Sequence, residues 1–266
     1  MSVDSPAQPD FIKRAAPAVP EVLQVRNLAK IYRGASQPAV QGLDFSICPG
    51  EVFGLLGPNG AGKTTAILVI CALMPPTGGS VTLCGHDVFH SPGSVRKLLG
   101  LAPQDLALYP RLTARENLRY FGRLHGLHGQ ALEARIDVCL DQVGLLENAD
   151  QRIDQYSGGM KRRANLAAAI VHSPRLLLLD EPTVGIDPQS RNLILKNLTE
   201  FRDQGMTILY TTHYMEEAQQ LCSRVGVMDS GRIIATGSTH DLLAQHPGCA
   251  NLEELFLQLT GKHLRD

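Results

Sequence analysis

The stretch "GPNGAGKTT", residues 57–65, decides the fold. It fits the pattern G-x-x-x-x-G-K-[ST], in which a glycine-rich turn brings backbone N–H groups close to phosphate oxygens. The stretch follows the β-rich "EVFGLLG" (51–57) and leads into the apolar "AILVICALM" (66–74), so we expect a strand, a phosphate-binding turn and a helix in that order. The alternative is a glycine-rich turn beside a solvated lysine, and the two correct flanks argue against it.

The residues of this turn have separate expected roles in a nucleotide site. Lys63 is expected to reach the β- and γ-phosphates, and the Thr64 hydroxyl is expected to coordinate Mg²⁺. The N-terminus of the following helix adds partial positive charge. The candidate nucleotide-binding residues are Gly57, Pro58, Asn59, Gly60, Ala61, Gly62, Lys63, Thr64 and Thr65.

A second predicted strand ends in two carboxylates, in "LLLLDEP" (176–182). Ligands bind at the carboxyl edge of a parallel sheet. We therefore expect Asp180 to hold the Mg²⁺ shell and Glu181 to polarise the attacking water as general base. The alternative, in which Asp180 caps backbone amides at a strand-to-helix connection, is weaker beside a phosphate-binding turn.

Short β-rich runs surround the glycine turn, and each predicts a strand. They are "LQVRNLAKIY" (23–32), "AVQGLDFSI" (39–47), "EVFGLLG" (51–57), "SVTLCGHDV" (80–88) and "LGLAPQ" (99–104). We expect the last two to form a further pair of strands.

Helical periodicity replaces this pattern from residue 112 to about residue 144. Another helix is expected over "SGGMKRRANLAAAIVH" (157–172), with Ser157 as its N-cap. Buried-strand signals return in "RLLLLD" (175–180) and "TILYTTH" (207–213), and two short amphipathic helices end the chain. The sequence therefore predicts an α/β fold with a helical insertion.

The composition is typical of a globular protein with no global attraction to polyanions. The chain has 266 residues, 44% of them hydrophobic, and a formal net charge of -1. The 6 cysteines are scattered without metal-ligand spacing, which predicts reduced thiols and neither a disulfide nor a zinc site. The run at 66–74 is about half as long as a bilayer span, and residues 1–21 predict a disordered leader rather than a signal peptide. These features indicate a cytosolic protein.

Four single polar residues are weak signals when each is taken alone. Gln104 is typical of an exposed loop amide, and Asp187 before a proline is typical of a helix N-cap. His213 is typical of a satisfied loop histidine, although at a strand end it could bind a phosphate or orient water. Tyr32 could stack on an adenine or fill a sheet face.

Taken together and in order, seven elements resemble the motif series of the ATP-binding cassette (ABC) ATPases. They are Tyr32, "GPNGAGKT" (57–64), Gln104, "YSGGM" (156–160), "LLLLDEP" (176–182), "GID" (185–187) and His213. The resemblance covers about residues 22–240. It implies a P-loop NTPase (RecA-like) core with an antiparallel β-subdomain and an inserted α-helical subdomain at about residues 105–172, followed by a helical tail at 241–266.

The resemblance also implies a role for each matching residue. Tyr32 would stack on the adenine, Gln104 would sense Mg²⁺ and water, and Asp187 would communicate between sites. Glu181 would be the catalytic base and His213 a switch residue. The signature turn would bind nucleotide through Ser157, Gly158, Gly159 and Met160. The cofactors would be ATP and Mg²⁺, with Thr64, Gln104 and Asp180 around the metal.

The implied function is that of an ATP-hydrolysing transporter subunit on the cytoplasmic side of the cell membrane. Its partners would be a separately encoded permease and a second copy of the chain, with no nucleic acid. The segments 212–238 and 252–266 are similar to the drug-resistance branch of exporters, which suggests export of a drug, lipid or glycan-like compound. The permease would contact the chain beside Gln104 and "ALYPRLTARENL" (107–118), which otherwise form an ordinary amphipathic helix pair.

Two other classes of function are alternatives. A soluble ABC ATPase acting on DNA or ribosomes would have a long coiled-coil insert, tandem cassettes or a basic surface, and the sequence has none of these. A P-loop kinase or GTPase would not explain "SGGM" or His213, and the N-K-x-D guanine motif does not occur.

The stretch "YSGGMKRR" (156–163) departs from the commonest signature, Leu-Ser-Gly-Gly-Gln, at Tyr156 and at Met160, which has no amide to donate. Its three cations oppose the helix dipole at a cost of about 0.3–1 kcal/mol per exposed charge, unless an anion lies nearby. They therefore favour a phosphate partner, and the alternative is that they extend into solvent. Because the first turn already holds one nucleotide, we expect this second turn to cover the γ-phosphate of an ATP bound by another copy.

Overall fold

The computed structural model describes residues 21–261, and a six-stranded sheet with the order β10-β9-β3-β8-β7-β6 runs through its centre. Neighbouring strands of this sheet are parallel, except that β10 is antiparallel to β9. The strands are β3 (Val52–Leu56), β6 (Leu99–Ala102), β7 (Leu176–Asp180), β8 (Thr207–Thr212), β9 (Arg224–Asp229) and β10 (Arg232–Gly237). The α/β prediction is confirmed.

Strand β7 shows why these residues form an inner strand of the sheet, paired on both sides. Its four leucines are fully buried, and they alternate between two hydrophobic clusters, because successive side chains of a strand point to opposite faces. Leu176 and Leu178 pack toward α1 and the second sheet, whereas Leu177 and Leu179 pack toward the helices of the other side. A strand that is apolar on both faces is typical of a parallel sheet covered on both sides.

A second, antiparallel sheet forms the β-subdomain, with the order β2-β1-β4-β5. Its strands are β1 (Leu23–Lys30), β2 (Val40–Ile47), β4 (Gly78–Leu83) and β5 (His86–Asp87). The expected pairing of 80–88 with 99–104 is wrong, because β4 belongs to this sheet and β6 to the central one. Pro92 begins a helix between them, and β6 pairs instead with β7, a contact about 77 residues away that no local pattern reveals.

The helices cover the central sheet and extend beyond both of its ends. They are α1 (Lys63–Ile70), α2 (Pro92–Leu98), α3 (Ala114–Leu124), α4 (Gly129–Gln142), α5 (Gly158–Ile170), α6 (Pro188–Asp203), α7 (Met215–Leu221), α8 (Thr239–Gln245) and α9 (Leu252–Thr260), with 3-10 turns at Leu146–Asn148 and Ile153–Gln155. Thr113 and Glu116 form a capping box at the start of α3, and Ser157 caps α5 as expected.

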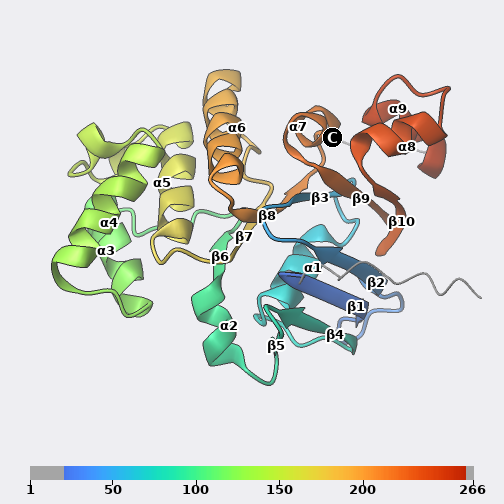
Figure 1. The fold of residues 1–266 in the computed structure, drawn as a ribbon, viewed down its shortest axis with the longest axis horizontal. Coiled ribbons are helices and arrows are strands. Elements are labelled where there is room, and N and C mark those ends of the chain that lie inside the picture. The colour runs from blue at the N-terminus through green and yellow to red at the C-terminus, as the bar shows by residue number, and fades with distance from the viewer. Residues whose placement is uncertain (1–20, 262–266) are drawn as a thin grey trace, which may run out of the picture.

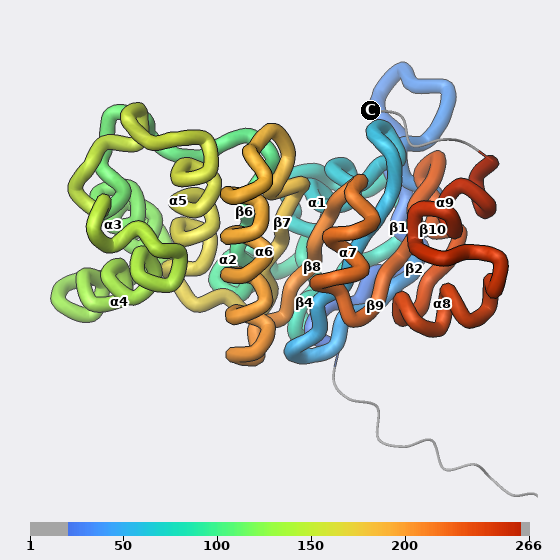
Figure 2. The backbone as a smooth tube through the Cα atoms, turned by 90° about the horizontal axis from the view of Figure 1, so that it is seen from above, coloured from blue at the N-terminus to red at the C-terminus, as the bar shows by residue number. Residues whose placement is uncertain are grey.

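Figure 1 shows α6 and α7 on one side of the central sheet and α1 on the other, with the β-subdomain beyond α1. Helices α3, α4 and α5 lie at one end of the molecule, and α8 and α9 lie at the other (Figure 2). Helices α3 to α5 fall inside the range 105–172 that was expected for the helical subdomain, whose limits stay a prediction. Most of the leader at 1–21 and the last five residues of the tail lie outside the described residues.

Within the described range, none of the helices combines the length with the apolar character that a membrane span needs.

Candidate active site

The register of the central sheet brings four predicted site segments to one edge. Asp180 pairs with Thr211, Leu56 with Thr212, and Ala102 with Leu179, so the carboxyl ends of β7, β8, β3 and β6 are neighbours. The residues that follow these ends are Glu181, His213, the glycine turn and Gln104. Segments separated by more than a hundred residues in the chain thus meet where a parallel sheet binds its ligands.

The glycine turn at 57–62 is held by contacts that only glycine allows. A Cβ at Gly57 would lie 2.3 Å from the carbonyl oxygen of Met228, and a Cβ at Gly62 would lie 2.3 Å from that of Ala39. Gly62 also has a φ of 104°, in the region that side chains disfavour. These constraints place the turn directly at the N-terminus of α1, whose free N–H groups attract anions.

Lys63 connects the glycine turn to the Glu181 carboxylate. Its side chain is 4% exposed, and Nζ donates hydrogen bonds to the carbonyl oxygens of Gly57 (2.8 Å) and Pro58 (3.1 Å). Nζ also lies 2.8 Å from Oε1 of Glu181. The ammonium group is therefore fixed at the point where a phosphate on the turn would meet the Glu181 carboxylate.

Glu181 is held by its backbone as well as by its side chain. Its φ is 47°, a left-handed conformation that is costly for a residue with a Cβ. The N–H group donates to Oγ1 of Thr211 (3.1 Å), and Oε2 lies 3.1 Å from Nδ1 of His213. The carboxylate thus sits between Lys63 and His213, and both of its oxygens are oriented.

Asp180 is buried beside the glycine turn. Thr211 donates a hydrogen bond to its Oδ1 (2.8 Å). Burial raises the pKa of the Asp180 carboxyl, and hydrogen bonds from Thr211 and Thr64 oppose that rise. Sequence reasoning missed Thr211, which holds both Asp180 and Glu181; its place two residues before His213 on the neighbouring strand was the available signal.

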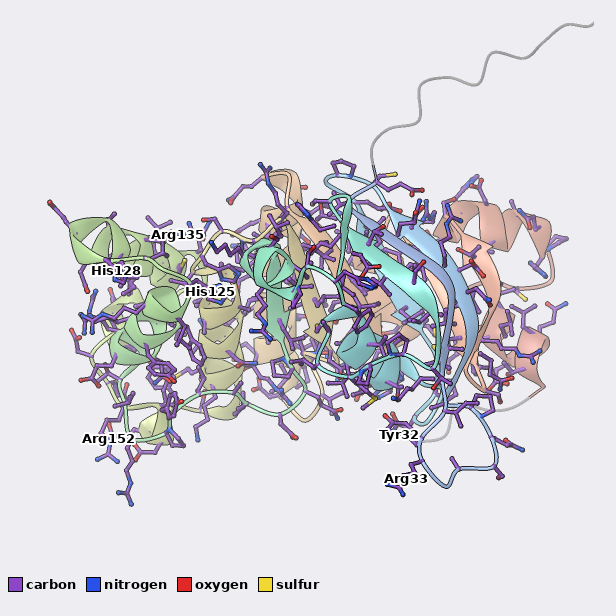
Figure 3. The ribbon with its side chains drawn as sticks, turned by 90° about the horizontal axis from the view of Figure 1, so that it is seen from below. Tyr32, Arg33, His125, His128, Arg135 and Arg152 are labelled. Atoms are coloured by element: carbon purple, nitrogen blue, oxygen red, sulfur yellow. The ribbon has the colours of Figure 1, made fainter. Side chains whose placement is uncertain are left out.

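A cavity of about 400 Å³ lies between these segments. It is lined by Ala39, Asn59, Gly60, Gly62, Lys63, Thr64, Thr65, Gln104, Glu181, Val184 and His213. Tyr32 lies at the adjoining surface, where its hydroxyl is 3.1 Å from Oγ1 of Thr65 and its ring stays partly exposed. Figure 3 shows Tyr32 beside the β-subdomain and far from His125, which lies at the helical end of the molecule.

The signature turn does not join this cavity. None of Ser157 to Met160 is among the lining residues. Oγ of Ser157 accepts a hydrogen bond from the backbone N–H of Met160 (3.2 Å), and Ser157 and Gly158 are exposed. Gly159 packs against Ser190 at the start of α6, where Asp187 caps the helix by accepting from the N–H of Ser190 (2.9 Å).

Two of the three cations after the signature turn, Arg162 and Arg163, have partners that the sequence did not suggest. Arg162 donates to the carbonyl oxygens of Gln104 and Val184, and Arg163 donates to those of Val143 (2.6 Å) and Gly144. The alternative that these two arginines extend freely into solvent is therefore wrong, and a phosphate partner from another copy stays a prediction. Arg162 instead holds two loops of the cavity wall, and Arg163 binds carbonyl groups at the end of α4.

Tyr156, where the commonest signature has leucine, has a structural reason to differ. Its ring is buried, and its hydroxyl donates to the carbonyl oxygen of Asn148 (2.7 Å). The hydroxyl satisfies a backbone group that leucine would leave without this partner.

Comparisons with known proteins agree with this geometry. The family model described as ABC transporter matches residues 40–184. The linearmycin resistance ATP-binding protein of Bacillus subtilis (strain 168) is 46% identical over 240 residues, which cover 90% of this chain and 75% of that protein. The Nod factor export ATP-binding protein I of Cupriavidus pinatubonensis is 43% identical over 89% of this chain and 72% of its own length.

Among solved structures, a dimeric ATP-binding cassette bound to ADP and Pi in a post-hydrolysis state aligns with a TM-score of 0.74 at 25% identity, covering 81% of this chain and 98% of that one. That protein has the same fold, and it carries the products of ATP hydrolysis. The chain therefore belongs to the ABC transporter family, as an ATP-binding and ATP-hydrolysing subunit.

Proposed function

We propose that this subunit works as an ATP-dependent dimer on the cytoplasmic side of a membrane and powers export of a drug, lipid or glycan-like compound through a separate permease. The meeting of Lys63, Glu181 and His213 at the phosphate-binding turn carries the catalytic part of the proposal. The names of the two relatives, linearmycin resistance and Nod factor export, support the direction of transport and the class of compound.

ATP would lie with its phosphates on the glycine turn and its adenine against Tyr32. The N–H groups at the start of α1 and the Lys63 ammonium supply the positive charge that the β- and γ-phosphates require. Tyr32 is anchored beside Thr65 and keeps an exposed ring face, which suits stacking on a base.

The oxygen donors around the turn fit Mg²⁺. Thr64 and Gln104 line the cavity, and Asp180 is buried near Thr64, whose hydroxyl helps to lower the pKa of the Asp180 carboxyl, so hydroxyl, carboxylate and amide oxygens lie around the turn. These three residues would hold the ion, which when bound would neutralise charge that develops on the phosphates.

Hydrolysis would depend on Glu181. Its Oε2 is oriented by His213 and its Oε1 by Lys63, so the carboxylate can accept a proton from water that approaches the γ-phosphate. His213 lines the cavity and can also contact that phosphate.

A second copy would complete the site. Ser157 and Gly158 are exposed at the start of α5 and lie outside the cavity of their own chain, so they remain accessible to the nucleotide of another chain. The dimeric state of the structural neighbour supports this arrangement. Asp187, at the start of α6, would lie near the boundary between the two copies.

A groove of about 720 Å³ between α2, α3 and α5 is our candidate docking surface for the permease. Leu73 and Leu124 line it with side chains that are 63% and 65% exposed. Arg96 and Lys97 add positive charge at its edge. The groove therefore suits a helix that presents apolar side chains and one or more carboxylates. Ala107, the first residue of the segment 107–118 at which the contact was expected, lines it too.

The variant Glu181→Gln tests the catalytic assignment and the dimer together. It keeps the shape of the side chain and removes its basicity, so we expect ATP turnover to fall by about 10²-fold or more while ATP binding persists. With ATP and Mg²⁺, the variant should accumulate as a dimer in light scattering. Undiminished hydrolysis would overturn the role of Glu181, and a variant that stays monomeric with saturating ATP would overturn the shared site.

A further inference from the structure

A buried carboxylate that does not line the nucleotide cavity lies close behind it. Glu217, on α7, is 3% exposed and follows His213 by four residues. Its Oε2 accepts hydrogen bonds from three hydroxyl groups, those of Tyr210 (2.6 Å), Thr183 (3.0 Å) and Thr212 (3.0 Å). A buried carboxylate is costly unless its oxygens are paired, so this concentration of donors is a built arrangement.

The three donors come from the two segments that carry the proposed catalytic pair. Thr183 lies two residues after Glu181, in the loop that leads to Asp187. Tyr210 and Thr212 are on β8, which ends immediately before His213. One oxygen atom of Glu217 therefore ties the loop after β7 to the end of β8.

The other oxygen of Glu217 is connected to His213 by a second chain of contacts, through Arg191 and Tyr214. Oε1 lies 3.4 Å from Nε of Arg191, on the first turns of α6. The Arg191 guanidinium lies over the ring of Tyr214, 4.5 Å from its centre, and that ring is 4.2 Å from the ring of His213. The N–H group of Tyr214 also donates to Thr212 (2.9 Å), so Tyr214 is held from both directions.

We propose that Glu217 is a positioning residue for ATP hydrolysis, which fixes His213 and the loop after Glu181 so that the imidazole orients the catalytic carboxylate. The inference rests on the proposed roles of Glu181 and His213. A residue that only filled space at this point would need neither a charge nor three hydroxyl partners, since apolar groups of similar volume pack there at no cost in buried charge.

The test uses the full-length chain and the variant Glu217→Gln, with Glu216→Gln as the matched control. Glu216 is the preceding residue of the same helix and is exposed. We expect Glu217→Gln to lower kcat for ATP by about tenfold to a hundredfold, the range of one or two hydrogen bonds to a charged group, with KM changed by less than about twofold. Glu216→Gln should leave both constants unchanged.

A double-mutant cycle separates positioning from a loss of folded protein. In a His213→Ala background, Glu217→Gln should lower the single-turnover rate by a smaller factor than in the wild-type background, because one of the two elements that Glu217 positions, His213, is already gone. An equal factor in both backgrounds, or a changed KM with kcat intact, would overturn the proposal.

Arg191→Met provides a second route if Glu217→Gln does not fold. The Arg191 side chain is 31% exposed, so its truncation is tolerable, and we expect kcat to fall by about threefold to tenfold with KM retained. Undiminished kcat in Arg191→Met would then count against the inference. Loss of activity in Glu181→Gln together with full activity in the Glu217 and Arg191 variants would refute the inference alone and leave the proposed function standing.

Discussion

The contact between α5, the helix that begins in the signature turn, and α6 permits a quantitative prediction at Gly159. A Cβ at this position would lie 2.0 Å from Oγ and 2.4 Å from Cβ of Ser190, whereas ordinary contacts begin at 3.4 Å. Gly159→Ala therefore forces α5 and α6 apart by about 1 Å, a change of the size that overpacked cores accommodate at a cost of about 1–3 kcal/mol.

The expected loss of stability follows from two opposing effects. Alanine has a better helix propensity than glycine, which offsets at most about 1 kcal/mol and less in a first turn. The net loss is about 1–2 kcal/mol, which for a chain of this size lowers Tm by about 2–8 °C. Differential scanning calorimetry of the wild type and the variant measures this shift directly.

A compensating substitution tests the cause. Ser190→Gly removes both clashing atoms and should by itself cost only about 0.5–1 kcal/mol. The double variant should be more stable than Gly159→Ala alone. A Gly159→Ala protein with the wild-type Tm, or a double variant that is no more stable than Gly159→Ala, would refute the packing argument.

Two further predictions concern the docking groove. Burial, and then the neighbouring His125, lower the pKa of His172 from 6.5 to about 4. Between these two pH values the unfolded chain therefore binds a proton that the folded chain does not. The free energy of unfolding should fall by about 1–2 kcal/mol as the pH drops from 6.5 toward 4, after allowance for solvent screening. His172→Gln should flatten the dependence of Tm on pH in this window, and the exposed control His128→Gln should not. Leu124→Glu should release the chain from membranes that contain its permease, whereas Val138→Glu, 47% exposed on α4 and outside the groove, should leave it bound in co-sedimentation.

The sequence predicted the parts of the site that follow strands. Residues at the ends of β3, β7 and β8 must meet at one edge once the strands are parallel, so the convergence of Lys63, Glu181 and His213 follows from strand order and motif spacing. The helix caps could also be predicted, because the side chains of Ser157 and Asp187 accept hydrogen bonds from backbone N–H groups only three residues further along the chain.

Contacts between distant segments could not be predicted in this way. Arg162 reads as an exposed cation in a first helical turn, but its carbonyl partner at Gln104 is 58 residues away. The pairing of β6 with β7 likewise depends on the helical insertion between them. In both cases the hydrogen-bond partner is a backbone group, and because every residue carries such a group, the residue type does not reveal the contact.

The left-handed backbone conformation of Glu181 implies a conflict between thermal stability and catalytic activity at this position. Glycine or asparagine adopts a φ of 47° more readily, so either residue would relieve a conformational cost of about 1 kcal/mol or more. Selection for heat resistance alone would favour such a replacement and would remove the base that we assign to hydrolysis. A glutamate should therefore persist in this conformation only while ATP turnover is under selection.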